Sequence, residues 1–234
     1  DEMSERLYEH HGIEKKKIIV VPNAEKKEFA NNFMNNKVNY FEDSFRDKFI
    51  ISYVGGFGPH RGLQTAIEAM PQVIKAIPNA RLVLIGPANN DVMQFLREKI
   101  RKLKLKNVVI LKGKEPFKNV VRIMNNSHIN IIPHISNEQT ESAVPHKFYQ
   151  ILLSKQPILV SDCAPMKRLI EENNIGNVFK AEDENSFADS VIRIYNNYNE
   201  AQEKAKRGFD LSFNGHLNWE SQSKSLIELY RNLD

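Results

Sequence analysis

The residues best able to bind a phosphate group begin with a glycine-rich loop at positions 55–62, Gly-Gly-Phe-Gly-Pro-His-Arg-Gly. Glycine lets backbone N–H groups approach a phosphate closely, and a guanidinium can pair with it. Gly55, Gly56 and Arg61 are therefore candidate phosphate ligands. The loop matches neither the dinucleotide-binding fingerprint nor a Walker loop. A tight turn that needs glycine explains it equally well.

A second candidate is the polar loop 136–144 together with the helix that follows it. Proline suits the first turn of a helix, and Pro145 is followed by apolar residues at helical spacing. The N–H groups and the dipole at such a helix start attract anions. We expect Ala143, Val144 and Lys147 to meet a phosphate there. An ordinary sheet-crossing helix with a proline start is the alternative, with equal weight.

Three other polar residues belong to the same stretch. Glu138 and Glu141 precede the helix, where a carboxylate can bind sugar hydroxyl groups or remain solvated, and the two interpretations carry equal weight. Gln150 lies in the first two turns of the helix and can hydrogen-bond a ribose hydroxyl.

Metal and nucleophile chemistry have less support. Four histidines are spread over different expected loops and strands, without the two-His helical spacing of a metalloprotease: His60, His128, His134 and His146. We therefore expect no metal site. The single cysteine, Cys163, follows an expected strand without an adjacent base, which is typical of a small buried apolar residue.

A scaffold must bring these stretches together, and the sequence from Lys48 onward indicates which one. Apolar runs that alternate with helical patterns predict six strands, at 49–54, 81–85, 108–111, 128–132, 158–160 and 177–179. Such alternation predicts an α/β fold, a doubly wound parallel six-stranded sheet covered on both faces. Loops 55–62, 86–91, 112–116 and 133–145 all follow strand ends, where this fold binds ligands. That shared position favours a nucleotide-type site.

The helices expected between and after these strands are 63–77, 91–103 with Asp91 as its N-cap, 117–126, one from Pro145, 166–173, 185–196 and 200–208. A last helix over 217–233 has Trp219, Leu226 and Leu229 as its expected anchors.

Residues 1–47 differ in composition from the rest. The pattern predicts a helix over 1–12, a strand over Lys17–Val21 and a short helix around 28–34. Because residues 24–47 carry no sustained period, we expect a domain boundary there. Residues 1–47 are interpreted as the tail of an N-terminal domain with a connector, and residues 48–234 as a Rossmann-like domain.

Overall composition indicates a globular protein. Apolar residues make up 41% of the chain and charged residues 26%, and no apolar run approaches the ~20 residues that span a membrane. The polar start and the single cysteine suggest a cytoplasmic piece of a longer protein. A net charge of +4 is mild, so we expect no nucleic-acid partner.

Four pieces of the chain, 17–23, 53–69, 145–162 and 219–230, resemble in order the C-terminal donor-binding domain of a retaining GT-B glycosyltransferase of group 1, family GT4. The third piece, which reads Pro-His-Lys-Phe-Tyr-Gln and ends in Gln-Pro-Ile-Leu-Val-Ser-Asp, is the most specific. The chain departs from the family pattern where Gln150 replaces a glutamate and Lys155 replaces a glycine. The family's preceding glutamate falls on Ser142, next to Glu141.

The resemblance implies transfer of a sugar from a UDP- or GDP-sugar, with retention, to a polysaccharide or lipid-linked acceptor, without an obligatory metal or other cofactor. Arg61 and Glu141 are then the expected catalytic residues, with the leaving phosphate at Arg61 and the helix start, and the backbone of Lys112 and Gly113 holds the base. Acceptor binding is expected from an N-terminal domain outside this chain, so this piece alone is expected to be inactive. Peripheral attachment to the inner membrane face fits a lipid-linked acceptor.

Three alternatives remain open. A non-catalytic sugar-nucleotide-binding or scaffolding domain of the same fold is favoured by Gln150 and Lys155. A sugar-nucleotide epimerase of GT-B shape would act without an acceptor. A nucleic-acid binder would show tight, salt-sensitive duplex binding.

Overall fold

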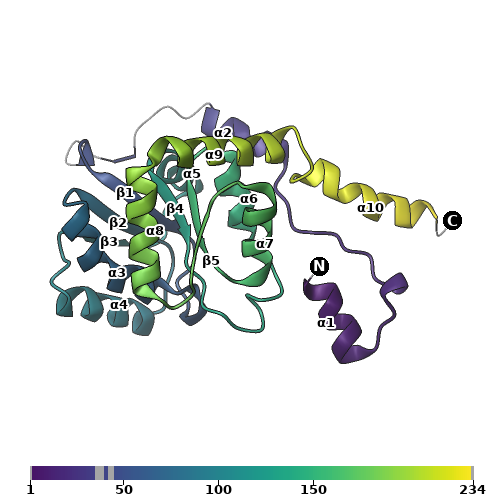
Figure 1. Ribbon diagram of the computed structural model, residues 1–234, viewed down its shortest axis with the longest axis horizontal. Helices are drawn as coiled ribbons and strands as arrows, with labels where there is room; N and C mark the ends of the chain where they lie inside the picture. The colour runs from purple at the N-terminus through teal and green to yellow at the C-terminus, as the bar shows by residue number, and fades with distance from the viewer. Residues whose placement is uncertain (1, 35–39, 42–44, 233–234) are drawn as a thin grey trace.

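A parallel sheet forms the centre of the computed structural model, which describes residues 2–34, 40–41 and 45–232 (Figure 1). Its strands are β1 Phe49–Val54, β2 Ala80–Ile85, β3 Val109–Lys112, β4 Ile129–Ile132, β5 Ile158–Ser161 and β6 Asn177–Phe179. The described strands pair in the order β3-β2-β1-β4-β5-β6, and every pair is parallel. This confirms the predicted doubly wound α/β sheet.

Helices cover both faces of the sheet. They are α3 Leu63–Ala76, α4 Asn90–Lys102, α5 Phe117–Asn126, α6 His146–Leu153, α7 Ala164–Asn173, α8 Glu184–Asn196 and α9 Tyr198–Phe213. Apolar residues of α3, α4 and α8 pack in one core with Ile51, Tyr53 and Leu82 of the strands. Those of α5, α6, α7 and α9 pack in a second core with Ile158 and Val160.

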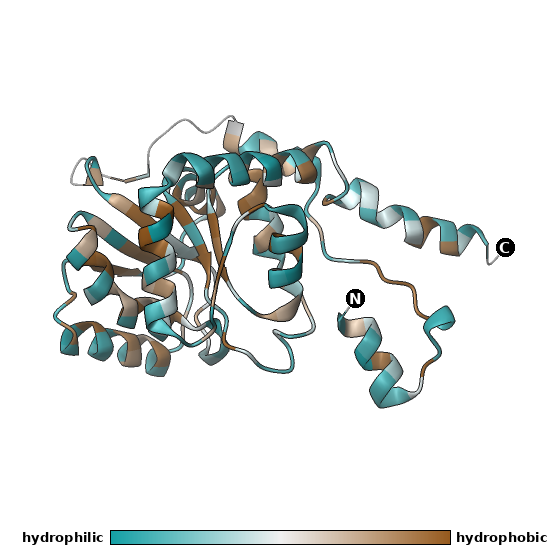
Figure 2. Ribbon diagram, viewed as in Figure 1, coloured by the Kyte–Doolittle hydropathy of each residue, from teal (hydrophilic) through white to brown (hydrophobic). Residues whose placement is uncertain are grey.

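The strands are apolar along their whole length because side chains on both faces are buried. In β1, for example, Ile51 and Tyr53 lie in the first core, whereas Ile50 packs with Val83 and Ile85 in a third cluster on the other side. A continuous apolar run is the expected signature of a parallel strand covered on both faces. Figure 2 shows these hydrophobic strands between helices whose outer surfaces are hydrophilic.

The order of the strands reverses between β1 and β4, and the loops after these two strands approach each other very closely. Gly62 has a left-handed φ of 64°, and a Cβ atom built on it would lie 1.6 Å from the carbonyl oxygen of Pro133. The backbone N–H of Ile135 donates to the carbonyl of His60 at 3.2 Å. The two loops therefore meet at the switch point, where doubly wound sheets bind ligands.

The N-terminal region contains α1 Glu2–His11, short 3-10 turns at Lys15–Lys17 and Lys27–Phe29, and α2 Ala30–Met34. Gly12 ends α1 with a φ of 62°, and the short helix around residues 28–34 lies near its predicted place. The strand predicted over Lys17–Val21 is wrong, because a strand needs a hydrogen-bonding neighbour and Ile18–Val21 run beside α7 rather than the sheet edge. The middle of the predicted connector, residues 35–39 and 42–44, lies outside the described residues.

The last helix, α10 Trp219–Arg231, extends away from the body of the molecule together with the N-terminal segment (Figure 1). The prediction that Trp219, Leu226 and Leu229 anchor it is wrong, since no residue of α10 is buried. Within the described residues, no helix is long and apolar enough to cross a bilayer.

The remaining element boundaries agree with prediction to within one to three residues, except at the end of α9, which continues to Phe213. At the start of α4 the predicted N-cap is wrong: Asn89, rather than Asp91, accepts a hydrogen bond from the backbone N–H of Val92 at 2.9 Å. An asparagine one turn before the first apolar residue competes equally well for this role.

Replacing Gly62 by alanine tests the contact between the two loops. We expect Gly62→Ala to lower the free energy of unfolding by about 3 kcal/mol, because the methyl group both strains the backbone and overlaps the Pro133 carbonyl. Urea unfolding measures the change. Gly113→Ala is the matched control, since a Cβ there meets nothing within 4 Å. Equal stability of the two variants would show that the loops can separate at little cost.

Candidate functional site

Four basic side chains gather at the switch point, and we refer to His60, Arg61, His134 and Lys147 as the basic cluster. His60 and Arg61 belong to the 3-10 turn Pro59–Arg61 in the loop after β1. His134 follows β4, and Lys147 lies in the first turn of α6. The four side chains thus come from segments far apart in the sequence. They lie close together because the carboxyl ends of parallel strands meet at one edge of the sheet.

Arg61 is held by a histidine. Its Nη1 atom lies 3.0 Å from Nε2 of His134, whose side chain is only 3% exposed. A guanidinium has donors and no acceptor, so Nε2 of His134 must accept this bond. The imidazole is therefore neutral, with its proton on Nδ1.

Lys147 points toward the glycine loop. Its Nζ atom lies 3.8 Å from the centre of the Tyr53 ring, a close cation–π contact. The Tyr53 hydroxyl donates to the carbonyl of Gly56 at 2.9 Å. A Cβ atom on Gly55 would lie 3.3 Å from Nζ of Lys147, so a glycine at this position leaves room for the ammonium group.

Among the described residues, no acidic side chain contributes to the pKa shifts of the two histidines and the lysine of the cluster. Burial and the nearby Arg61 guanidinium hold the pKa of Lys147 well below its usual range. Burial, followed by Lys147, Arg61 and His60, also lowers the pKa of His134, to about 2. Burial, Arg61 and Lys147 lower the pKa of His60. The charged groups that act on each of these side chains are thus other members of the cluster.

Two further features make the cluster suitable for an anion. The N–H groups of His146 and Lys147 belong to the first turn of α6, where the helix offers them no internal acceptor. The Nε2 atom of His60 is buried and has no hydrogen-bond partner among the described residues. A bound phosphate would supply acceptors for these amides and negative charge for Arg61 and Lys147.

The family model described as glycosyl transferases group 1 matches residues 37–210 of this chain. The chain belongs to this family. Its fold class and its resemblance to GT-B glycosyltransferases are thereby confirmed, since the similar solved structures are of the same architecture.

Among curated relatives, the uncharacterized glycosyltransferase MJ1059 of Methanocaldococcus jannaschii is 25% identical over 166 residues, which cover 70% of this chain and 39% of the relative. HepE of Anabaena, solved in complex with UDP and glucose, matches with a TM-score of 0.78 at 13% identity, over 94% of this chain and 59% of HepE. A glycosyltransferase of Rickettsia africae matches with a TM-score of 0.79 at 13% identity, over 99% of this chain and 61% of that protein. The chain therefore spans between two fifths and three fifths of these proteins.

In this group 1 domain, the predicted site residues fall into two sets. Gly55, Gly56, Arg61 and Lys147 come together at the basic cluster. Sequence reasoning considered His60 and His134 only as metal ligands and missed their place beside Arg61. Both histidines lie in loops that follow the strands at the switch point, which was a usable signal for their location but not for the contact of His134 with Arg61.

The second set of predicted residues makes other contacts. Gln150 donates from Nε2 to Oε2 of Glu25 at 2.9 Å. Glu138 is exposed and forms an ion pair with Arg6. Glu141 accepts from the backbone N–H of Ala164 at 2.8 Å and from the Ser136 hydroxyl at 2.6 Å, so its carboxylate caps the start of α7.

The residues predicted to hold the base lie at the carboxyl end of β3. Lys112 donates from Nζ to the Tyr40 hydroxyl at 3.2 Å, and that hydroxyl donates to Glu115 at 2.9 Å. Gly113 is exposed, with open space around it. The Lys112 side chain is thus turned to Tyr40, while the adjacent backbone remains accessible.

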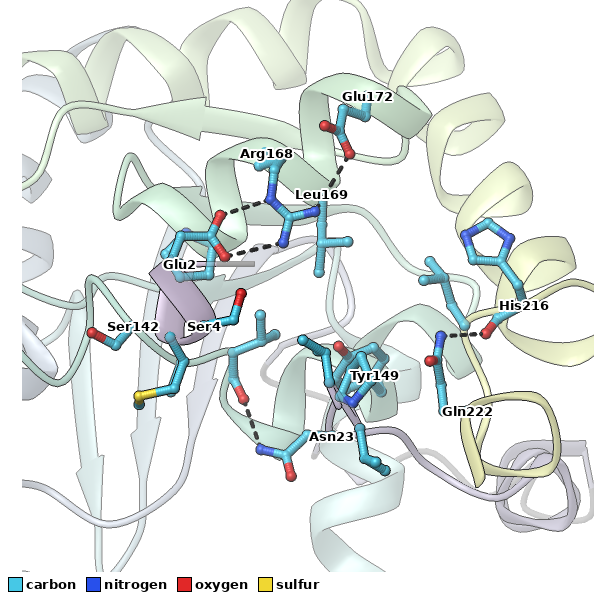
Figure 3. A pocket seen from close by; sticks show the side chains of 18 of the residues that line it. Glu2, Ser4, Asn23, Ser142, Tyr149, Arg168, Leu169, Glu172, His216 and Gln222 are labelled. Carbon is cyan, nitrogen blue, oxygen red and sulfur yellow. Dashed lines mark hydrogen bonds and ion pairs between the residues drawn. The ribbon is translucent and has the colours of Figure 1, made fainter. Parts of the chain in front are cut away.

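Ala143 and Val144 lie on a separate hollow of about 590 Å³, beside the N-terminal segment and α7 (Figure 3). There the carbonyl of Val144 accepts from Nδ2 of Asn23 at 3.1 Å, and Arg168 pairs with Glu2 at 2.6 Å. Neither Arg61 nor Lys147 lines this hollow. In the described part of the chain, no group of three His, Cys, Asp or Glu residues could hold a metal ion.

The contact of Glu141 with α7 generates a prediction. Glu141→Ala should lower the free energy of unfolding by about 1 kcal/mol, because the N-terminal amide of α7 loses its acceptor. Glu141→Gln keeps one acceptor oxygen and should lose less than half as much, and thermal unfolding compares the two variants. A stable Glu141→Gln variant that loses sugar transfer would instead favour the catalytic role expected from the sequence.

Proposed function

We propose that this chain is the donor-binding part of a retaining glycosyltransferase that uses a UDP- or GDP-sugar. The observation that carries the proposal is the basic cluster at the switch point, where Arg61 and Lys147 have no acidic partner in the described part of the chain. Membership of the group 1 family and the UDP and glucose in the HepE crystal structure support it.

In the proposed reaction, the donor's diphosphate is the leaving group, and negative charge develops on its oxygens as the glycosidic bond breaks. We expect Arg61, Lys147 and the first-turn amides of α6 to stabilise that charge. Because these groups are fixed before the reaction, little reorganisation is needed. The sugar is passed to a polysaccharide or lipid-linked acceptor, which we expect a part of the protein beyond this chain to bind.

A non-catalytic domain that binds a sugar nucleotide is the second candidate. One contact favours it: Gln150, which replaces the family's glutamate, is engaged by Glu25 rather than free for a ribose. Both candidates bind a nucleoside diphosphate, so binding does not separate them. The longest natural form of the protein, given a panel of sugar nucleotides, transfers or hydrolyses one under the first proposal and none under the second.

The role of Arg61 can be tested by nucleotide protection. We expect UDP or GDP at about millimolar concentration to raise the unfolding temperature of the chain, and Arg61→Ala to weaken binding roughly 10- to 100-fold, since a charge-assisted hydrogen bond is lost. Arg101→Ala, an exposed arginine in the last turn of α4, is the matched control. Absence of any shift with either nucleotide would contradict the proposed function.

The lowered pKa of Lys147 predicts a pH dependence of binding. Burial and the Arg61 guanidinium disfavour the charge of this ammonium group, which His60, His134 and the Tyr53 ring also face. A bound diphosphate favours that charge, so binding takes up a proton. Affinity for UDP should therefore rise as the pH falls from about 9 to about 7. Calorimetry measures it, and Lys147→Met should bind weakly with a flat profile. A flat profile in the unmodified chain would refute the link.

A further inference from the structure

The way Arg61 is held carries a consequence for donor binding. Arginine side chains that must keep one direction are commonly held by a carboxylate in a bidentate ion pair. Here a neutral imidazole takes that place, at 3.0 Å from Nη1 of Arg61. It fixes one N–H of the guanidinium and leaves the other donors of the fork for a ligand.

The difference between a neutral and an anionic holder matters at this position. A carboxylate would cancel most of the charge of Arg61 and would compete with the phosphate oxygens for its donors. A neutral acceptor does neither. The positive charge of Arg61, and that of Lys147 once binding has protonated it, then remains available to the donor's diphosphate, while the direction of the guanidinium is still set.

The holder itself is rigid. His134 is 3% exposed, and its backbone lies between two tight contacts: the carbonyl of Pro133 against Gly62 and the N–H of Ile135 bonded to the carbonyl of His60. Its carbonyl also accepts a weak bond from Sγ of Cys163 at 3.8 Å. The imidazole therefore has a fixed base from which to hold Arg61.

We propose that His134 is a positioning residue for the donor: it aims the Arg61 guanidinium at the diphosphate while adding no negative charge to the pocket. This inference rests on the proposed function, because it assigns His134 a part in the same site. It adds a residue at which the affinity depends on a side chain that both accepts a hydrogen bond and carries no negative charge.

Three replacements of His134 separate the parts of this proposal. His134→Gln keeps a neutral hydrogen-bond acceptor of similar reach. His134→Glu has the same shape as the Gln variant but carries a negative charge. His134→Phe keeps an aromatic ring but has no acceptor. The dissociation constants of UDP and of inorganic pyrophosphate are measured by calorimetry for each variant. Thermal unfolding without ligand shows which variants remain folded.

We expect His134→Gln to bind both ligands within about threefold of the unmodified chain, and His134→Phe and His134→Glu to bind at least about tenfold more weakly. Equal affinities of the Gln and Glu variants would overturn the claim that neutrality matters. An unchanged affinity in a folded His134→Phe variant would overturn the positioning role.

A double-mutant cycle distinguishes positioning from a general structural effect. If His134 acts through Arg61, His134→Phe in an Arg61→Ala background should change the UDP dissociation constant by less than about twofold. A tenfold loss in that background as well would show that His134 acts through the scaffold. Failure of the proposed function is a separate outcome: the unmodified chain would then bind neither UDP, GDP nor pyrophosphate.

Discussion

The close approach of the loops after β1 and β4 is the constraint on which the site depends. Gly62 brings the backbone of one loop so near the Pro133 carbonyl of the other that a side chain cannot fit between them. Arg61 precedes that glycine, and His134 follows that proline. Their hydrogen bond is thus a consequence of two backbones pressed together at the point where the strand order reverses. The strand order determines where the two loops meet, and Gly62 allows their backbones to come into contact.

The same arrangement is unfavourable in the absence of a ligand. Arg61, Lys147 and two histidines share a small volume, and each lowered pKa in the cluster records the cost of adding charge there. A protein selected for stability alone would place a carboxylate among these groups. Since no acidic side chain of the described residues acts on the cluster, a bound anion would supply the negative charge that these groups lack. This electrostatic cost is confined to the cluster, because both cores beneath it consist of buried apolar residues.

Sequence patterns predicted those features that depend on neighbouring residues. The strands at 49–54 and 177–179 and the helix at 117–126 were correct to the residue, because their apolar periods are set by burial on defined faces. Gly55 and Arg61 were singled out because they lie in a glycine-rich loop after a strand, and Lys147 because it lies at a helix start. His134 was missed as a partner of Arg61, since a contact across 73 positions leaves no local pattern. The strand prediction at 17–21 was wrong for a related reason: an apolar run does not show whether another strand lies beside it to pair with.

Lys155 and Gln150, the two departures from the family pattern, differ in how much they bear on the proposed function. Lys155 stands where the family has glycine, and its φ of 57° is the left-handed conformation that glycine adopts easily. Its ammonium lies 3.9 Å from the centre of the Phe209 ring, a contact that offsets part of the backbone strain. Lys155 follows the last turn of α6, about 12 Å along the helix from Lys147, so it does not reach the basic cluster.

Gln150 lies between Lys147 and Lys155 along the chain. It is the departure from the family pattern that bears on the proposed binding of a donor. Its amide is engaged by Glu25, and His146, one turn earlier, lies 3.6 Å from the same carboxylate. The sequence resemblance implies a glutamate at this position of α6, and here the carboxylate of Glu25 lies beside the same residue. A carboxylate supplied from residue 25 preserves the charge next to Gln150, which weakens the case for a non-catalytic domain that the substitution at position 150 would otherwise make.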